Sequence, residues 1–188
     1  MSLTGKNNEE KIWNFLTGKG LNSYGAAGLM GNLFAESGLN PHNLQNTYEK
    51  KLGYTDDSYT EAVDSGKYTG FTHDSAGYGL AQWTYWSRKE ALLNYVKAAG
   101  ASIGDLETQL GFLWKELGEN YAAVLATLKK ATSVRQASDA VLLKYEQPKD
   151  QSASVQTKRA SYGQTYFDKY ATKTTNDTQG GKTMSNSS

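Results

Sequence analysis

The sequence has 188 residues, 38% hydrophobic and 21% charged, so it is long enough to bury one sizeable core and is expected to form one domain. Its 20 basic and 19 acidic residues give a net charge of +1, which excludes the strongly basic surface typical of nucleic-acid binders. Cysteine is absent, which excludes disulfides, thiolate metal sites and a cysteine nucleophile, and no apolar run is long enough to span a bilayer.

Helical periodicity begins near the start of the chain. The first predicted helix covers "NEEKIWNFLTGKG", with Asn8 as its N-cap and acidic residues in its first turn. The second runs from a Ser23 cap to about Glu36. It carries Gly28 and Gly31 on one stripe, which indicates close helix packing and not a phosphate-binding loop. No basic segment followed by an apolar stretch opens the chain, so we expect no secretion signal.

The interval 43–79 has no helical stripe and is rich in Tyr, Thr, Asp and Gly. It is longer than the roughly 15 residues that a structureless loop normally reaches inside a compact domain. Within it, "KYTGFTHDSAGYGL" alternates weakly and contains the turn-forming residues Gly70, Asp74, Ser75 and Gly77, which predicts a short β-hairpin. The predicted fold is therefore mainly α (α+β), with a small irregular or β-hairpin lobe inserted after the second helix.

Five more helices are predicted in the second half of the chain. Their sequences are "SRKEALLNYVKAAG" with a Ser87 cap, "DLETQLGFLWKELG", "NYAAVLATLKKA", "SVRQASDAVLLKYEQP" and "SASVQTKRASYGQTYFDKYA". Residues 171–188 are too poor in apolar residues to be buried, so we expect them to form a flexible linker. Such a linker favours a chain that is one module of a longer protein.

The segment "AESGLNP" places a single carboxylate, Glu36, at the end of the most apolar helix. Glu36 follows Leu29 and Leu33 at helical spacing, so we expect it on the apolar face and partly desolvated. Burial and the negative end of the helix dipole both disfavour the charged form, which favours a general acid for glycosidic bond cleavage. The alternative is a solvated surface Glu, the usual environment of this residue type.

A second motif, "SAGYGLAQWTYW", closes the irregular interval. Gln82 offers an amide that both donates and accepts hydrogen bonds, and several aromatic rings offer flat apolar faces. An amide beside aromatic rings suits N-acetylated sugars. The aromatic residues are Tyr78, Trp83, Tyr85 and Trp86, and for Trp83 and Trp86 the alternative is that they begin the core face of the next helix.

Together, "AESGLNP" and, about forty residues later, "SAGYGLAQW" resemble the first two motifs of the superfamily of goose-type lysozymes and lytic transglycosylases. The similarity is closer to the phage tail lysozyme family, found in phage tail tips, endolysins and conjugative-element cell-wall hydrolases. It covers about residues 9–170 and includes "IWNFL", "GLMGNLFAESGLNP", "GYGLAQWT", "LETQLGFLWKEL" and "KYEQPKD…RASYGQTYFDKY".

The resemblance implies a lysozyme-like catalytic domain over residues 9–170 that acts on the peptidoglycan glycan strands of the bacterial cell wall, from a virion tail or from outside the cell. It implies Glu36 as the catalytic acid and Gln82 in the substrate groove. It implies no cofactor or metal, and no nucleic-acid or membrane partner is expected. His42 and His73, the only histidines, lack the spacing of a zinc peptidase.

The resemblance also suggests that Tyr145 and Glu146 come near the site. The alternative is a helix end stopped by Pro148, with Glu146 paired to Arg159 on the surface. The expected substrate-binding residues are thus Gln82, Tyr78, Trp83, Tyr145, Asp74, Ser75 and Glu146.

Hydrolysis normally needs a second carboxylate. Asp74 is the favoured candidate because it adjoins the second motif, and the alternative for every candidate is a solvated loop. Without a second carboxylate, the 6-hydroxyl of muramic acid can attack internally and give an anhydro product, as in the transglycosylases. We favour hydrolysis by a muramidase, and an inert wall-binding module is the remaining alternative. The other candidates are Asp56, Asp57, Glu61 and Asp64.

Overall fold

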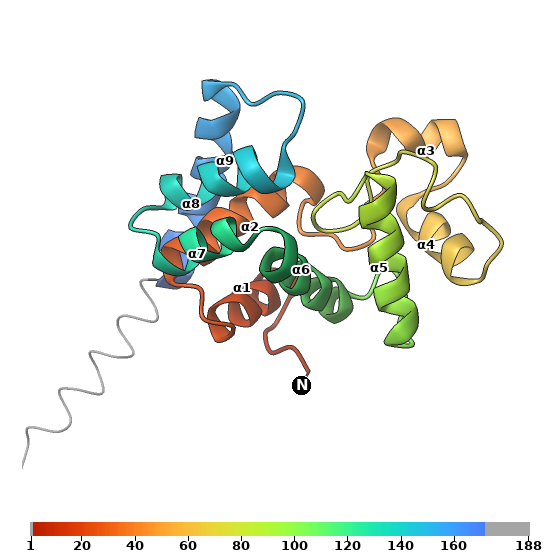
Figure 1. Ribbon diagram of the computed structural model, residues 1–188, viewed down its shortest axis with the longest axis horizontal. Coiled ribbons are helices and arrows are strands. Elements are labelled where there is room, and N and C mark those ends of the chain that lie inside the picture. The colour runs from red at the N-terminus through yellow and green to blue at the C-terminus, as the bar shows by residue number, and fades with distance from the viewer. Residues whose placement is uncertain (1, 172–188) are drawn as a thin grey trace, which may run out of the picture. The chain divides into compact units, whose positions relative to one another are not determined.

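The computed structural model describes residues 2–171, which are mainly helical (Figure 1). This part of the chain contains nine α-helices and two short π-helical segments, and no sheet forms within it. No helix among these residues is long and apolar enough to cross a membrane. In chain order the elements are α1 (Asn8–Gly18), α2 (Ser23–Ser37), α3 (Asn46–Leu52), α4 (Asp56–Asp64), α5 (Trp86–Ala98), α6 (Leu106–Asn120), α7 (Ala122–Lys130), α8 (Val134–Val141), η1 (Leu142–Glu146), α9 (Ala153–Tyr166) and η2 (Phe167–Ala171).

The described chain divides into two compact units. The first unit comprises residues 2–12 and 33–122, and the second comprises residues 13–32 and 123–171. Helices α1 and α2 each contribute residues to both units, and the last turn of α2 belongs to the first. Of the predicted linker 171–188, only Ala171 is described, as the buried last residue of η2, and residues 172–188 lie outside the described part.

All seven helices predicted from periodicity are confirmed, as α1, α2 and α5 to α9, but two of their caps lie one residue earlier than predicted. The side chain of Asn7, not Asn8, accepts a hydrogen bond from the backbone of the first turn of α1 at 2.9 Å. Asn22, not Ser23, does the same for α2, also at 2.9 Å. In both cases Asn is the residue whose oxygen reaches the third helical N–H, which is the defining contact of an N-cap.

The predicted cap of α5 is also wrong. Ser87 is the second residue of this helix, which begins at Trp86, and Tyr85 occupies the N-cap position without a side-chain cap bond. The next helix, α6, is capped by Asp105, whose carboxylate accepts from the Thr108 N–H at 3.0 Å. Helices α5 and α6 pack against each other in the first unit.

The predicted β-hairpin lobe is not formed. The interval 43–79 contains the two short helices α3 and α4, whose start and stop signals are local. Helix α3 ends at Gly53, which has a φ of +78°. Helix α4 begins with a capping box in which Thr55 and Ser58 bond each other's backbone N–H groups. These capped helices satisfy backbone groups that a hairpin would otherwise have paired.

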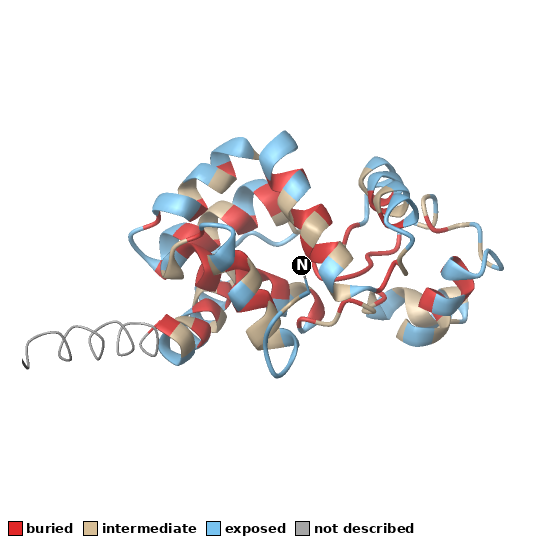
Figure 2. Cartoon of the chain, turned by 90° about the horizontal axis from the view of Figure 1, so that it is seen from below, coloured by how far each residue is buried: buried red, intermediate tan, exposed pale blue. Residues whose placement is uncertain are grey.

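In the second unit, the glycine stripe of α2 has the predicted packing role. A Cβ placed on Gly28 would lie 2.5 Å from the Cβ of Ala137, and one on Gly31 would lie 2.5 Å from the backbone N of Gly163. Helix α2 therefore lies so close to α8 and α9 that a side chain at position 28 or 31 would clash with them. Buried residues follow these inward helix faces, while the outward faces are exposed (Figure 2).

A buried polar network crosses the same contact. The Asn32 side chain donates to the carbonyl and hydroxyl oxygens of Ser138, at 3.1 Å each, and its oxygen accepts from Arg159 Nη1 at 3.1 Å. Arg159 is buried, which contradicts the surface position that the alternative interpretation gave to this residue. A buried polar group is stable only when hydrogen-bonded, so this network fixes the mutual position of α2, α8 and α9.

Candidate active site

Glu36 lies in the last turn of α2 and is half-buried. Its neighbour Ser37 is buried, and the Ser37 hydroxyl reaches the Leu33 carbonyl at 3.0 Å and the Leu80 carbonyl at 2.8 Å. Leu80 belongs to the second motif. One side chain therefore ties the turn that carries Glu36 to the "GYGLAQW" loop, 43 residues away in the sequence.

The second motif forms a tight reversal that also pairs with the chain following α2. Tyr78 and Trp83 exchange two backbone hydrogen bonds, of 3.0 and 3.1 Å, across the turn between them. Leu44 forms an isolated antiparallel bridge with Tyr78, and the side-chain oxygen of Gln45 accepts from the Gly77 N–H at 2.9 Å. The chain at Leu44 and Gln45, which follows the first motif, therefore lies beside Gly77 and Tyr78 of the second motif.

Gln109 on α6 braces this arrangement. It is fully buried, its oxygen accepts from the Leu80 N–H at 3.0 Å, and its nitrogen donates to the carbonyls of Pro41 and Ile103 at 2.7 Å each. One amide thus bonds both motifs at once. Sequence reasoning missed Gln109, because a Gln inside an amphipathic helix carries no local signal of its partners.

The predicted substrate-binding amide, Gln82, is half-buried and bound to the loop itself. Its side-chain nitrogen donates to the carbonyls of Asn43 and Gly79, at 2.9 and 3.0 Å. Its backbone has a φ of +53°, which is unfavourable for a residue with a Cβ. Gln82 therefore shapes the loop beside the Glu36 turn.

The predicted aromatic faces divide into two groups. Tyr78 and Trp83 are fully buried, with the Tyr78 hydroxyl bonded to Thr60 and the Trp83 indole N–H donating to Glu116 at 3.0 Å. These two rings are core residues and offer no exposed face to a ligand. Tyr85 and Trp86 are exposed instead.

Asp74, the favoured second carboxylate, belongs to a buried ion pair. Its oxygens accept from Lys89 Nζ at 2.8 Å and from the hydroxyls of Tyr59 and Tyr68 at 2.6 and 2.9 Å. Lys89 is fully buried and also donates to the Ala76 carbonyl at 2.7 Å. The Asp74 carboxylate is thus fully occupied in holding the loop that precedes the second motif.

Burial shifts the pKa values of the groups around Asp74. Desolvation raises the pKa of Tyr59 and of Tyr68 far above the usual tyrosine range, and the hydrogen bond to Asp74 raises both further. Burial lowers the pKa of Lys89, while the bond to Asp74 opposes that shift. The neutral tyrosines therefore act as hydrogen-bond donors to the Asp74 carboxylate.

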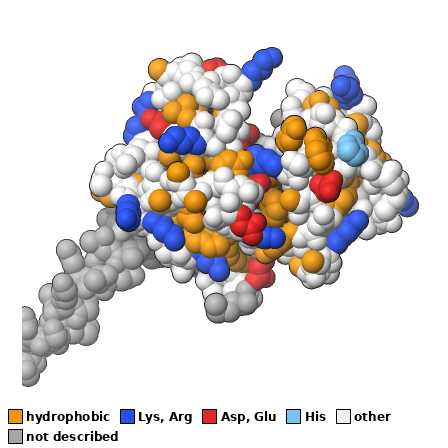
Figure 3. Space-filling model, viewed as in Figure 1, with side chains coloured by type: hydrophobic (Ala, Val, Ile, Leu, Met, Phe, Trp, Pro, Cys, Tyr) orange, Lys and Arg blue, Asp and Glu red, His pale blue; other side chains and the backbone are white. Residues whose placement is uncertain are grey.

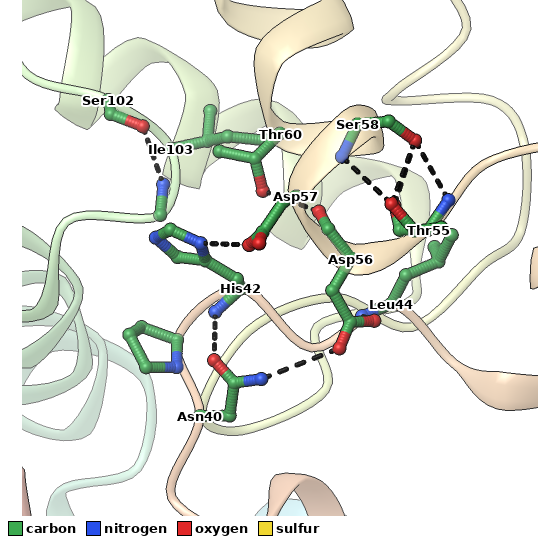
Figure 4. Close-up of polar contacts among 12 residues, drawn as sticks. Asn40, His42, Leu44, Thr55, Asp56, Asp57, Ser58, Thr60, Ser102 and Ile103 are labelled. Atoms are coloured by element: carbon green, nitrogen blue, oxygen red, sulfur yellow. Dashed lines mark hydrogen bonds and ion pairs between the residues drawn. The ribbon is translucent and has the colours of Figure 1, made fainter.

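Two further candidate carboxylates lie at the start of α4 (Figure 4). Asp56 accepts from the Leu44 N–H at 2.9 Å and from the Asn40 side chain at 3.4 Å. Asp57 is 83% exposed and lies 2.9 Å from Nδ1 of His42. Figure 4 shows the His42 ring turned toward Asp57, while the Asn40 oxygen accepts from the His42 N–H.

The remaining predicted residues are spread over both units. Asp64 ends α4 and accepts from the Ser102 hydroxyl and, at 3.0 Å, from the Ile103 N–H. Glu61 on α4 and Ser75 in the following loop are exposed. In the second unit, η1 carries Tyr145, which is buried, and Glu146, which is half-buried.

Two grooves are lined by first-unit residues alone. One, of about 670 Å³, is lined by Asn40, Pro41 and His42, which follow the Glu36 turn in the sequence, and by residues that include Ser102 and Asp105. The other, of about 570 Å³, runs along α5 and α6. Glu36 lines neither groove.

Among residues 2–171, no group of three or more His, Asp and Glu side chains is arranged to hold a metal ion. A comparison with curated proteins finds no match. The family model described as phage tail lysozyme matches residues 7–170, a range that includes the Glu36 turn, the Gln82 loop and the Gln109 brace. The chain therefore belongs to the phage tail lysozyme family.

Proposed function

We propose that this protein cleaves the glycan strand of bacterial peptidoglycan as an N-acetylmuramidase, with Glu36 as the general acid. Family membership implies a lysozyme-like cell-wall enzyme whose substrate is peptidoglycan, acting from a virion or at the wall. The observation that carries the residue assignment is the bond from Ser37 to the Leu80 carbonyl, because it joins the Glu36 turn to the second motif.

In this mechanism the protonated Glu36 carboxyl donates to the glycosidic oxygen as the bond to the anomeric carbon breaks. Water then attacks the anomeric carbon, its released proton returns to the Glu36 carboxylate, and the product has a reducing muramic acid end. Glu36 is half-buried in the last turn of α2, next in sequence to Ser37, whose hydroxyl bonds the second motif.

Substitution Glu36→Gln tests the assignment because it keeps the shape of the side chain and removes the proton. Clearing of a peptidoglycan suspension should fall by roughly 10²–10⁴, the usual contribution of a general acid. The matched control is Glu90→Gln, which makes the same charge change at an exposed position on α5. Equal clearing by wild type and Glu36→Gln, with both folded by circular dichroism, would overturn the assignment.

A lytic transglycosylase is the second candidate, and the state of four of the five candidate carboxylates, all except the exposed Glu61, favours it. Asp56, Asp64 and Asp74 each accept bonds from protein groups, and Asp57 is paired with His42. A carboxylate held in this way is poorly suited to activate water. In the transglycosylase the 6-hydroxyl of muramic acid attacks the same anomeric carbon, so a single acid suffices.

Mass spectrometry of the digested wall, with and without borohydride, separates these chemistries. Reducible muramic acid ends indicate a muramidase and reducible glucosamine ends a glucosaminidase, whereas non-reducible anhydro ends indicate a transglycosylase. A wall that sediments the protein but releases no fragments would indicate an inert binding module.

A further inference from the structure

Two aromatic side chains at the start of α5 lie outside the core. Among the described residues, Tyr85 and Trp86 are the most exposed large hydrophobic side chains, at 64% and 49%. Their ring centroids are 6.0 Å apart and the ring planes are tilted by 44°. The fold makes no evident use of them, because α5 packs inward through Lys89, Leu92 and Val96.

The residues that flank the pair in the sequence are polar. Thr84 and Ser87, which flank it in the sequence, are both exposed. The groove of about 570 Å³ along α5 and α6 begins at Ser87 and Arg88, in the same turn as Trp86. Its wall offers both donors and acceptors, among them Asn94, Glu119 and Asn120. The aromatic pair thus directly precedes, in the sequence, the residues that line a groove able to form hydrogen bonds.

We propose that Tyr85 and Trp86 form an aromatic platform on which an N-acetylated sugar of the glycan strand stacks, with the neighbouring groove binding the polar groups of the strand. This inference rests on the proposed function. A sugar ring has an apolar C–H face and a polar rim, and an aromatic face attracts the slightly positive C–H groups. The Tyr and Trp rings also lose little conformational entropy on binding.

The size of the patch favours a sugar over other occupants. A stable protein interface buries roughly 800 Å² per partner, and docking on a protein or a lipid surface uses a contiguous apolar patch of several hundred Å². Here the exposed pair consists of two rings flanked in the sequence by the polar residues Thr84 and Ser87, which matches one or two sugar units.

Co-sedimentation with insoluble cell-wall sacculi tests the platform, in the Glu36→Gln background so that the wall is not digested. Trp86→Ala should weaken binding about tenfold, as expected when a central aromatic anchor is truncated, and Tyr85→Ala severalfold. Trp86→Phe, which keeps a flat ring, should retain most of the affinity. The matched control is Tyr24→Ala in the second unit, an aromatic side chain that is 36% exposed and stacked on Phe167.

A second measurement locates the contact. The Trp86 indole N–H signal, assigned by its loss in Trp86→Phe, should shift when a soluble β-1,4-linked N-acetylglucosamine oligomer is added, while the signals of buried Trp13 and Trp83 stay in place. Unchanged sedimentation of folded Trp86→Ala and Tyr85→Ala would overturn the platform even if Glu36→Gln abolishes clearing. Conversely, Trp86→Ala and Tyr85→Ala could both sediment less with the wall while Glu36→Gln clears peptidoglycan as fast as wild type. That result would reject only the catalytic assignment of Glu36.

Discussion

At the residue scale, Gly79 is the position in the second motif where a side chain is least tolerable. Its φ is +83°, and a Cβ there would lie 2.8 Å from the Gln109 oxygen. Gln109 has little freedom to retreat, because its amide already bonds Leu80, Pro41 and Ile103. Glycine at position 79 therefore leaves the space that the Gln109 side chain needs to bond both motifs.

Gly79→Ala should destabilise the protein by about 2 kcal/mol, since a left-handed Ala costs about 1–2 kcal/mol and the Gln109 contact adds strain. Urea unfolding followed by circular dichroism measures this. Gly118→Ala is the control, because no atom lies within 4 Å of the added Cβ and Ala favours a helix, so it should stabilise by about 0.5–1 kcal/mol. Equal midpoints for the two variants would show that Gly79 is not constrained.

The same residues mark how far the sequence could predict the site. The Glu36 turn and the Gln82 loop were both identified, and they do meet through Ser37. The directions of the aromatic rings were not predictable. They depend on the turn between Tyr78 and Trp83, where Gln82 takes a positive φ, and a composition rich in aromatic residues does not reveal which rings point inward.

At the element scale, two contacts fix elements within their own units. The first is the close approach of α2 to α9, in which backbone meets backbone at Gly31 and Gly163. The second is the ion pair of Lys89 on α5 with Asp74, which holds the loop before the second motif. Helices α3 and α4 were missed by periodicity because both are short and largely polar, so their caps carry the signal.

Gly31→Ala should cost about 1–3 kcal/mol, because the new Cβ would lie 2.5 Å from the Gly163 nitrogen and 2.6 Å from the Arg159 carbonyl, so backbone must move. Thermal unfolding should show a lower midpoint than wild type, and Gly118→Ala again provides the control. A midpoint equal to that of wild type would mean that α2 and α9 can separate without penalty.

Lys89→Met should be strongly destabilising, by about 3 kcal/mol, because it leaves the Asp74 carboxylate buried without its cation. The estimate is at the low end of the range for buried pairs because Tyr59, Tyr68 and the Ala76 N–H still donate to Asp74. Adding Asp74→Asn should restore part of the loss by removing the charge. Denaturant unfolding of the three proteins measures both steps, and a Lys89→Met variant as stable as wild type would refute the role of the pair.

At the scale of the whole molecule, charge is nearly balanced and the two signs are interspersed over the face shown in Figure 3. Acid and base effects on stability are therefore expected from particular buried groups and not from net charge. The strongest such groups are tyrosines of the first unit. Periodicity predicted seven of the nine α-helices in residues 2–171, but the buried polar partners of these helices depend on contacts that are distant in sequence.

Stability should fall above about pH 10. Burial raises the pKa of Tyr59, Tyr68 and Tyr78 above the ordinary value of about 10, so the folded protein keeps protons that the unfolded chain releases. Their contribution is fully present below about pH 10 and is lost as pH rises toward the folded-state values. Lys89 has the opposite effect, because burial lowers its pKa in the folded protein. Its titration makes stability rise with pH, but only below its ordinary pKa of 10.5.

Thermal midpoints measured from about pH 9 to pH 12 should therefore decline beyond pH 10, with the tyrosinate absorbance of Tyr59, Tyr68 and Tyr78 appearing together with unfolding. Tyr59→Phe removes one of the shifted groups and should make the decline shallower. A constant midpoint over this range, or complete tyrosine ionisation in the folded protein, would contradict the expected linkage.

The single bond from Ser37 to Leu80 has a practical consequence for protein engineering. Because the acid turn, the Gly-Leu-Ala-Gln loop and Gln109 hold one another, no one of them is a transferable part. A chimaera that imports the "AESGLNP" segment alone would receive a carboxylate without its support. The smallest graft that keeps the geometry comprises residues 33–45, residues 77–83 and the α6 position of Gln109, exchanged together.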